Sequence, residues 1–337
     1  MLLFLYFLLF LTVFNIVNCQ NEEVNGGGNR NRIKGKSGLQ GKKKVKRATG
    51  KRRNPKDFPS ALQINYPLSH FHEDYKKDWR NPGEYDDKFA LDNLEKRKWV
   101  SIARSQDQED VWLWERYFYG VKNGVVMESG ALDGNLFSNS VLFEKFANWT
   151  TINVEADPTN YGNLILNRPN AINVNGALCS EPRLLHYSSY GVIPVRGFIE
   201  FMAESFIKKW HGPIYNKKVS IDELPTVQCL PVKQLLRHLN VKHIDLWILD
   251  VEGAEESVLK GVDFNEVNIN FVAMECDEHD IEKNERKTSI LEANDFKCDL
   301  IDRNCMCRNN KAKFSEMPGE KSKLSKWNGQ KYVAINK

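Results

Sequence analysis

Three acidic residues and two glycines have the types and the spacing of a nucleoside-binding site. Glu128, Glu155 and Asp250 each end an apolar run, and Gly130 and Gly134 bracket the turn that follows the first run. Glycine has no Cβ, so the backbone of such a turn approaches a ligand closely. A carboxylate at the end of the next run, as at Glu155, is suitably placed to accept hydrogen bonds from two ribose hydroxyls. The pattern therefore predicts a site for a ligand that contains a nucleoside.

The glycine turn differs from the dinucleotide-binding pattern G-x-G-x-x-G. Residues 128–134 read E-S-G-A-L-D-G, which places Leu132 at the position of the second glycine and Asp133 beside it. A pyrophosphate needs close backbone contact and the positive end of a helix, and both residues oppose it. A cofactor with a positive sulfonium and no phosphate tolerates them, so we expect S-adenosylmethionine rather than NAD. The alternative is that the glycines only form tight turns and the acids only cap surface loops.

Apolar runs that alternate with helical patterns predict an α/β fold. Strands are expected at 125–130, 151–155, 171–178, 244–249 and 271–275, and helices at 137–147, at 158–168, after residue 231 and from Glu252. Such alternation is typical of a parallel sheet with helices on both faces. Ligands of these sheets bind beyond the carboxyl ends of the strands, where the three acids are expected.

Three further segments belong to the predicted domain. Acidic residues in 105–110 precede the apolar run 111–118, as at the start of a helix. Residues 180–226 interrupt the alternation, and their aromatic residues at helical spacing fit a packing helix, a lid or a substrate-side insertion. The C-terminal part offers two more strands, near 296–301 and 332–336.

The cysteines favour an oxidising compartment. Six of them follow residue 19, at Cys179, Cys229, Cys276, Cys298, Cys305 and Cys307. An even number is typical of a disulfide-bonded protein. The last three lie close together in the sequence, so a local disulfide and free thiols are both open. Zinc would need a fourth ligand at regular spacing, and none is obvious, so no metal site is expected.

The N-terminal part has the composition of a leader followed by a linker. Residues 1–19 are mostly apolar, which fits a cleaved signal peptide or an uncleaved anchor in contact with a membrane. Residues 20–56 form a basic linker: positions 24–56 hold thirteen Lys or Arg and no Asp or Glu. A segment of this composition buries no core. No nucleic-acid partner is expected, because no recognition fold accompanies the charge.

Residues 57–104 read as an N-terminal extension and residues 105–337 as the main domain. A glycosylation sequon begins at Asn148. Together with the leader, these features predict a glycoprotein of the secretory pathway, in the ER or Golgi lumen or secreted, or membrane-anchored if the leader is kept.

Several ordered motifs together resemble the FkbM-type methyltransferase domain, and among its members the invertebrate Star-like branch. They lie at 128–134, 138–140, 149–150, 154–158, 167–168, 227–231, 249–255 and 331–337. The resemblance covers about residues 105–337. It implies a class I methyltransferase fold: a Rossmann-like, mostly parallel seven-stranded sheet with helices on both faces, whose sixth and seventh strands form an antiparallel hairpin. Two departures are Ser140, where the family commonly has Thr, and the longer segment 180–226.

The resemblance also implies a methyl-donor site. The residues that would bind S-adenosylmethionine are Glu128, Gly130, Asp133, Gly134, Asn139, Glu155, Asp157 and Asp250. Asp250 is expected near the methionine end of the donor or near the acceptor. The alternative role for Glu252 and Glu255 is to cap the helix that follows Asp250. His279 is a candidate general base, because an imidazole titrates near neutral pH, with an exposed loop histidine as the alternative.

Two functions remain open at this point. Members of the resembled family with known activity methylate hydroxyl oxygens, often on sugars, so the first is methyl transfer to a hydroxyl of a glycan, lipid or protein. The second is escort of secretory cargo by a non-catalytic protein, because one fold hosts several functions.

Overall fold

The structure is a computed structural model that describes residues 82–94, 97–276, 278–312, 325–327 and 332–334. The chain divides into two units, 1–54 and 55–337, and all the described residues belong to the second. The predicted leader, the basic linker and the first part of the extension lie outside the described residues. Within the described part, no helix has the length and apolar character needed to cross a membrane.

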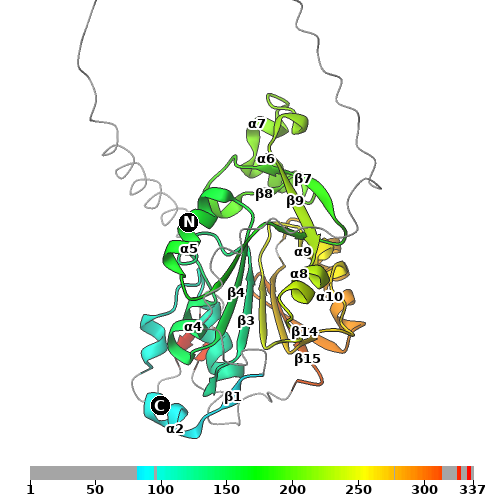
Figure 1. Cartoon of the computed structure of the whole chain (residues 1–337). Helices are drawn as coiled ribbons and strands as arrows, with labels where there is room; N and C mark the ends of the chain where they lie inside the picture. The colour runs from blue at the N-terminus through cyan, green and yellow to red at the C-terminus, as the bar shows by residue number, and fades with distance from the viewer. Residues whose placement is uncertain (1–81, 95–96, 277, 313–324, 328–331, 335–337) are drawn as a thin grey trace, which may run out of the picture. The chain divides into compact units, whose positions relative to one another are not determined.

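A seven-stranded sheet forms the centre of the described domain (Figure 1), with the order β14-β15-β13-β11-β3-β4-β5. Its strands are β3 (Val125–Ser129), β4 (Thr150–Glu155), β5 (Ile172–Asn175), β11 (Leu246–Leu249), β13 (Phe271–Glu275), β14 (Phe296–Ile301) and β15 (Asn304–Asn309). The five strands from β5 to β13 are parallel, and β15 runs antiparallel to both of its neighbours. The predicted α/β fold with a mostly parallel seven-stranded sheet is confirmed.

Successive residues of the central strands face two separate apolar cores. In β3, Val125 and Met127 belong to one core and Val126 to the other, because neighbouring side chains of a strand point to opposite faces. The first core includes residues of α8 (Val232–His238), α9 (Glu255–Lys260) and α10 (Ile281–Glu292), and the second includes residues of α3 (Glu109–Leu113) and α4 (Val141–Ala147). Helices therefore cover both faces of the sheet, as predicted.

The described N-terminal elements pack on the second core. They are β1 (Glu84–Tyr85), α2 (Asp87–Leu94), a 3-10 helix (Lys98–Ser101) and β2 (Val121–Lys122), which pairs with β1. The fully buried Trp99 contacts Trp114 and Tyr119 ring to ring. The helix predicted over 111–118 is present as α3, followed by a π-helix over Trp114–Phe118.

Local backbone conformation explains where two helices begin. The helix predicted from residue 137 starts only at Val141, because Phe137 adopts a left-handed φ of 56° that ends any helical path before it. Likewise α9 starts at Glu255, after Glu252 and Gly253 with φ of 55° and 94°. The helix predicted at 158–168 agrees with α5 (Pro158–Asn167).

The segment that interrupts the alternation builds a second, four-stranded sheet with the order β6-β9-β7-β8. Its strands are β6 (Ala177–Cys179), β7 (Arg183–Ser188), β8 (Gly197–Phe198) and β9 (Thr226–Pro231). The predicted strand 171–178 is therefore divided at Gly176 between two sheets. Two helices, α6 (Glu204–Trp210) and α7 (Gly212–Tyr215), follow β8 at the top of Figure 1. We call residues 180–226 the insertion.

The strand expected near 332–336 is present over Tyr332–Ala334, but it lies outside the main sheet. The seventh strand is β15, which follows β14 after a two-residue turn, Asp302-Arg303. A short turn costs little loop-closure entropy, so β15 forms the hairpin rather than a distant segment. The described part of the closing segment is β17 (Tyr332–Ala334), which pairs with β16 (Ser325–Trp327) as a separate sheet.

Three disulfides pair all six cysteines that follow residue 19. They are Cys179–Cys229, Cys276–Cys305 and Cys298–Cys307. The last one is a local disulfide of the predicted kind, because Cys298 and Cys307 are direct partners in the β14–β15 hairpin. The other two join segments that are distant in the sequence.

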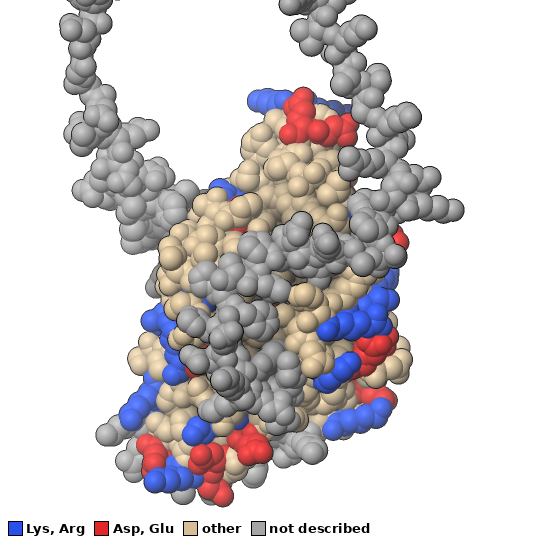
Figure 2. All heavy atoms as spheres, in the orientation of Figure 1, with Lys and Arg blue, Asp and Glu red and all other residues tan. Residues whose placement is uncertain are grey.

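Remaining short elements are two 3-10 helices (Ile193–Val195 and Ile221–Glu223), and β10 (His243–Ile244), which pairs with β12 (Asn268–Ile269). The surface face in Figure 2 shows basic and acidic side chains side by side. Among the described residues, Arg237 pairs with Glu266 and Arg286 pairs with Glu256.

Candidate functional site

The carboxyl ends of four neighbouring strands meet at one edge of the main sheet. Glu155 is the last residue of β4, Asp250 directly follows β11, and Glu275 is the last residue of β13. The order β13-β11-β3-β4 places these ends next to one another. The sequence prediction that acids from separate segments share one edge therefore agrees with the geometry.

The glycine turn is in direct contact with the Asp250 loop. Gly130 has a φ of 85°, and a Cβ on it would lie 1.8 Å from the carbonyl oxygen of Asp250. The amide of Asp250 donates to the carbonyl of Ser129 at 3.1 Å. Position 134 also requires glycine, because its φ is 75° and a Cβ there would lie 2.4 Å from the Leu164 side chain. Both glycines are required by close approach within the protein itself.

Glu128 holds the loop that follows the glycine turn. Its carboxylate accepts hydrogen bonds from the hydroxyls of Ser138 (2.7 Å) and Ser140 (2.6 Å) and from the amide of Asn139 (2.7 Å). The residue is 3% exposed. These three bonds hold the loop in place, and the expected contact of Glu128 with the methyl donor stays a prediction.

Arg168 extends this buried network, and the sequence analysis gave it no role of its own. Its guanidinium donates to the carbonyl of Gly134 (3.1 Å) and to the hydroxyls of Ser138 and Ser140. It also forms an ion pair with Glu144 of α4. The guanidinium therefore connects the second glycine with the serines that hold Glu128.

Two further candidate residues also have internal partners. The Asp133 carboxylate accepts from the amides of Asn135 (2.9 Å) and Leu136 (2.7 Å), which closes a local turn. The Asp157 carboxylate accepts from the amide of Thr159 (2.7 Å) and that of Asn160, and so caps the start of α5.

Asn139 keeps one unused hydrogen-bonding atom. Its side-chain oxygen is buried and has no partner among the described residues. Buried polar atoms normally have partners, so an unpaired one beside the glycine turn is a feature that a bound ligand would explain. The residue fits a site for the amino group of a methyl donor.

Glu155 is buried at the end of β4 and is only 5% exposed. Its two oxygens accept hydrogen bonds from the amides of Leu132 (2.8 Å) and Asp157 (2.7 Å). Each carboxylate oxygen accepts more than one hydrogen bond, so capacity for ribose hydroxyls remains. Burial raises the pKa of Glu155 to about 7. The insertion contributes Tyr187, whose pKa is raised by burial and by the charges of Glu155 and Asp157.

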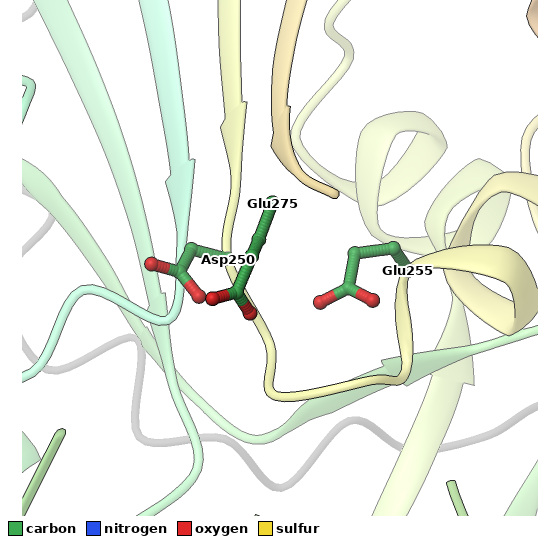
Figure 3. Close-up of side chains that lie close together, drawn as sticks. All are labelled: Asp250, Glu255 and Glu275. Atoms are coloured by element: carbon green, nitrogen blue, oxygen red, sulfur yellow. The ribbon is translucent and has the colours of Figure 1, made fainter. Parts of the chain in front are cut away.

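Three carboxylates gather beyond β11 and β13, in a group that we call the acid cluster: Asp250, Glu255 and Glu275 (Figure 3). Their nearest oxygens all lie within 4.8 Å of one another. Asp250 is exposed to solvent. Desolvation by the protein atoms around its carboxyl, together with the charge of Glu255, raises the pKa of Asp250 to about 6. The sequence analysis missed Glu275 as a site residue, although its position at a strand end was a usable signal.

Positive groups balance part of the acid cluster. The Lys287 ammonium lies 3.6 Å from Glu255. The positive charge of Arg303 lowers the pKa of Asp250 and so favours its ionised form. Glu255 also accepts from the amides of Val251 and Gly253, so it holds the loop that precedes α9. The expected helix cap is not formed, because no side chain accepts a hydrogen bond at the N-cap of α9. Clustered carboxylate oxygens are ligands that hard divalent cations prefer. Because Lys287 already supplies positive charge here, we assign no metal.

A pocket opens beside the acid cluster, between the insertion and α10. It is open to solvent, and its cavity volume, counted as space for the centres of water-sized molecules, is about 30 Å³. Met202, Ala203 and Phe206 line the insertion side, and His279 lies on the opposite side. The His279 ring accepts or donates one hydrogen bond at Nδ1, 3.0 Å from the Ser205 hydroxyl, and packs edge-on against Phe206. We call this space the acceptor-side pocket.

Asn148, the predicted glycosylation site, is exposed at the end of α4. Its side-chain amide donates to Asn123 at 2.6 Å. Solvent therefore reaches the residue, as a surface modification requires.

Comparisons with known proteins agree with the site at the level of the family. The sequence matches the "Methyltransferase FkbM domain" over residues 128–303. A comparison with curated proteins returned no match. No comparison supports the narrower resemblance to the Star-like branch.

Solved structures show more distant similarity. The methyltransferase FkbM of Methylobacillus flagellatus shares 13% identity, with 66% of this chain and 56% of that chain covered and a TM-score of 0.36. The fibrillarin pre-rRNA processing protein of Methanococcus jannaschii shares 14% identity (54% and 64% covered, TM-score 0.30). Aeropyrum pernix fibrillarin, solved with natively bound S-adenosyl-L-methionine, shares 12% (54% and 64% covered, TM-score 0.29).

Each of these three matches spans less than two thirds of the solved chain. Their TM-scores of 0.29 to 0.36 are too low to support an argument about this protein. The family match carries more weight, since it includes Glu128 and the carboxyl-edge acids and ends at Arg303. Because it covers more than half of the sequence, the chain belongs to the FkbM methyltransferase domain family.

Proposed function

We propose that the protein is an S-adenosylmethionine-dependent methyltransferase that methylates a hydroxyl group on a glycan, lipid or protein acceptor. The observation that carries this proposal is the contact between the Gly130 turn and the Asp250 loop, which joins a donor-type turn to an acid at the carboxyl edge. Membership of the FkbM methyltransferase domain family supports the donor. The hydroxyl acceptor rests on the acids of the site.

The residues at this edge fit the proposed methyl donor. Gly130 leaves room for close backbone approach, and Glu155 retains acceptor capacity for ribose hydroxyls. The unpaired oxygen of Asn139 suits the amino group. Glu128, Asp133 and Asp157 shape the site through the bonds described above and do not need to touch the ligand. S-adenosylmethionine, when bound, supplies an electrophilic methyl group.

Asp250 is the group best placed to take the proton of an acceptor hydroxyl. Its side chain reaches solvent, and a pKa of about 6 leaves it mostly ionised at neutral pH while it still binds a proton readily. With the donor bound, transfer of the methyl group to the acceptor oxygen would break the carbon–sulfur bond and leave S-adenosylhomocysteine, and the Asp250 carboxylate would hold the proton that the acceptor hydroxyl gives up. The rest of the rate gain comes from holding the two reactants in line. We give His279 the lesser role of lining the acceptor-side pocket.

We also propose that the protein works in the secretory pathway, in the lumen or outside the cell. The three disulfides, which pair every described cysteine, support this placement because structural disulfides persist in oxidising compartments. The apolar leader and the exposed Asn148 agree with it. The Star-like resemblance of the motifs at 128–134 and 227–231 is part of this proposal.

Titration calorimetry with S-adenosylhomocysteine tests the donor site. We expect binding to the wild type and at least tenfold weaker binding for Glu155→Ala and Gly130→Val. Gly162→Ala is a control, because no atom lies within 4 Å of a Cβ at that position. Absence of binding to folded wild type, or equal binding by the two site variants, would contradict the proposal.

One observation favours a second function, a non-catalytic escort of secretory cargo. Glu128, Asp133 and Asp157 all bond within the protein, and Glu155 is almost fully buried. A fold retained for binding alone would keep such bonds. Cells that lack the protein and retain a secreted client, with full rescue by Glu155→Ala, would favour escort. Donor-dependent labelling of a glycan or protein fraction that Glu155→Ala abolishes would favour the enzyme.

A further inference from the structure

The insertion packs directly on the end of β4. Ala156, which follows the last residue of that strand, lies against a cluster of apolar residues that includes Tyr187 of β7 and Phe198 of β8. Tyr187 and Phe198 are also partners across the β7–β8 ladder, and their ring centroids lie 5.4 Å apart in an edge-on arrangement. The insertion therefore reaches the part of the donor site where Glu155 is expected to bind the ribose.

Asp157 anchors two polar side chains of the insertion at this place. The Tyr187 hydroxyl donates to the Asp157 carboxylate. Arg196 directly precedes β8, and its Nη1 lies 3.8 Å from Oδ2 of Asp157. The arginine side chain is 26% exposed, so protein covers most of it while solvent still reaches one side. These contacts hold a guanidinium beside the end of β4.

Two buried donors next to Asp157 have no partner among the described residues. One is Nε of Arg196, and the other is the side-chain nitrogen of Asn160, a residue that is 5% exposed. The backbone amide of Asn160 donates to the Asp157 carboxylate at 3.1 Å, so both residues contact the same acid. Buried N–H groups normally have acceptors, because an unmade hydrogen bond costs free energy. A ligand that brings lone pairs to this place would supply them.

The surroundings restrict the chemistry of such a ligand. A phosphate or sulfate is opposed by the carboxylates of Glu155 and Asp157, because like charges repel strongly where little water screens them. An ammonium or sulfonium is no better for the two unpaired donors, since a cation of this kind has no lone pair to accept from them. A purine base fits, because its ring nitrogens N1, N3 and N7 accept hydrogen bonds and carry no charge.

We propose that Arg196 binds the purine base of the methyl donor and donates a hydrogen bond from its Nε to a ring nitrogen of adenine. This inference rests on the proposed S-adenosylmethionine site and names a further residue of it. Asp157 then acts indirectly, because it holds the arginine of the insertion beside the base. The insertion thus supplies a binding residue for the donor and is more than a packing segment.

Calorimetry with base-modified ligands tests the contact on the full chain. The probes are S-adenosylhomocysteine and its 1-deaza, 3-deaza and 7-deaza analogues, in each of which a CH group replaces one ring nitrogen. We expect the wild type to bind at least one analogue about fivefold to tenfold more weakly than S-adenosylhomocysteine. Equal affinity for all four ligands would overturn the proposal, since no ring nitrogen would then accept a hydrogen bond.

Arg196→Met locates the contact in the protein. Methionine retains much of the length of the arginine side chain but has no N–H donor. The variant should therefore bind the deaza analogue that wild type disfavours as tightly as it binds S-adenosylhomocysteine. A folded variant that still discriminates between these ligands as strongly as wild type would overturn the role of Arg196, because another donor would then form the bond.

Arg183→Met is the matched control within the insertion. The Nε of Arg183 is also buried without a partner among the described residues, but its guanidinium lies over the Phe201 ring, 5.2 Å from the centroid. This variant should keep the discrimination that wild type shows. Loss of discrimination in both variants, with both folded by circular dichroism, would overturn the assignment to Arg196.

Failure of this inference is distinguishable from failure of the proposed function. Absence of S-adenosylhomocysteine binding by the folded wild type would overturn both. Binding of S-adenosylhomocysteine without a weaker deaza analogue would leave the donor site in place and remove only the contact between Arg196 and the base.

Discussion

Gly130 lies so close to Asp250 that a Cβ on the glycine would fall 1.8 Å from the aspartate carbonyl oxygen. The φ of 85° at Gly130 is a second reason why no other residue fits. Residues 120 positions apart are thus forced together, and the donor-type turn and the proton-accepting loop share one contact. Any side chain at position 130 must separate them.

Gly130→Val should therefore destabilise the protein as well as weaken donor binding. We expect a loss of more than about 3 kcal/mol in the free energy of unfolding, from backbone strain and the clash together. Urea unfolding measures it. Gly162→Ala in α5 is the control and should stabilise by about 0.5–1 kcal/mol, since a helical glycine without neighbours benefits from a Cβ. A Gly130→Val protein as stable as wild type would show that the contact is not close.

Arg168→Ala should destabilise this protein more than the substitution of a charged residue on its surface. The arginine is 1% exposed, and its loss leaves Glu144 without its ion-pair partner and the hydroxyl oxygens of Ser138 and Ser140 without this donor. Breaking a buried pair on one side costs about 3–5 kcal/mol. Arg237→Ala, which removes a solvent-exposed pair with Glu266, should leave the unfolding midpoint nearly unchanged. Similar unfolding midpoints for the two variants would contradict the buried network.

Methyl transfer should depend on pH through Asp250. The carboxylate must be ionised to accept a proton, and its pKa of about 6 means that the rate falls about tenfold per pH unit below that value. Asp250→Asn should remove this acidic limb along with most of the activity. Rates of labelled-donor consumption between pH 5 and 8 provide the measurement. A flat wild-type profile over this range would exclude Asp250 as the base.

Glu109 makes stability depend on pH in the direction opposite to that of a paired carboxylate. Burial raises its pKa from 4.5 to about 7, so the folded state binds the proton more tightly than the unfolded state. The stabilising contribution is complete below about pH 4.5 and is lost as pH rises through 7.

Glu109→Gln should therefore stabilise the protein at pH 8 by up to about 3 kcal/mol and have little effect at pH 4.5. The amide keeps an oxygen for the Asp107 amide, at 3.0 Å in the wild type. Thermal unfolding at both pH values measures the difference. Equal shifts at the two pH values would show that the pKa of Glu109 does not change on folding.

The disulfides should contribute to stability according to the length of chain that they close. Replacing Cys179 and Cys229, which are 50 residues apart, with alanines should cost about 4 kcal/mol by the chain-entropy relation. Replacing Cys298 and Cys307, which are 9 apart, should cost about 3 kcal/mol. Urea unfolding of the two double variants tests the order, and a larger loss from the second pair would contradict it.

Much of the fold follows from local patterns in the sequence. The parallel strands were predicted within a few residues, because buried parallel strands are short continuous apolar runs such as Val125–Ser129. The disulfide in the β14–β15 hairpin was one of two open alternatives, since nearby cysteines meet in a local turn. The strand Asn304–Asn309 was missed, because its polar and cysteine-rich sequence lacks that apolar signal.

The sequence by itself determined the glycine turn, the acids at the strand ends and the family to which they belong. Only the tertiary structure decided what each acid does. Glu128 and Asp157 bond to nearby backbone and side chains, whereas Asp250 meets Glu255 and Glu275 from other segments. The types and spacing of residues are local properties, but burial, pKa and pocket walls depend on which distant segments pack together.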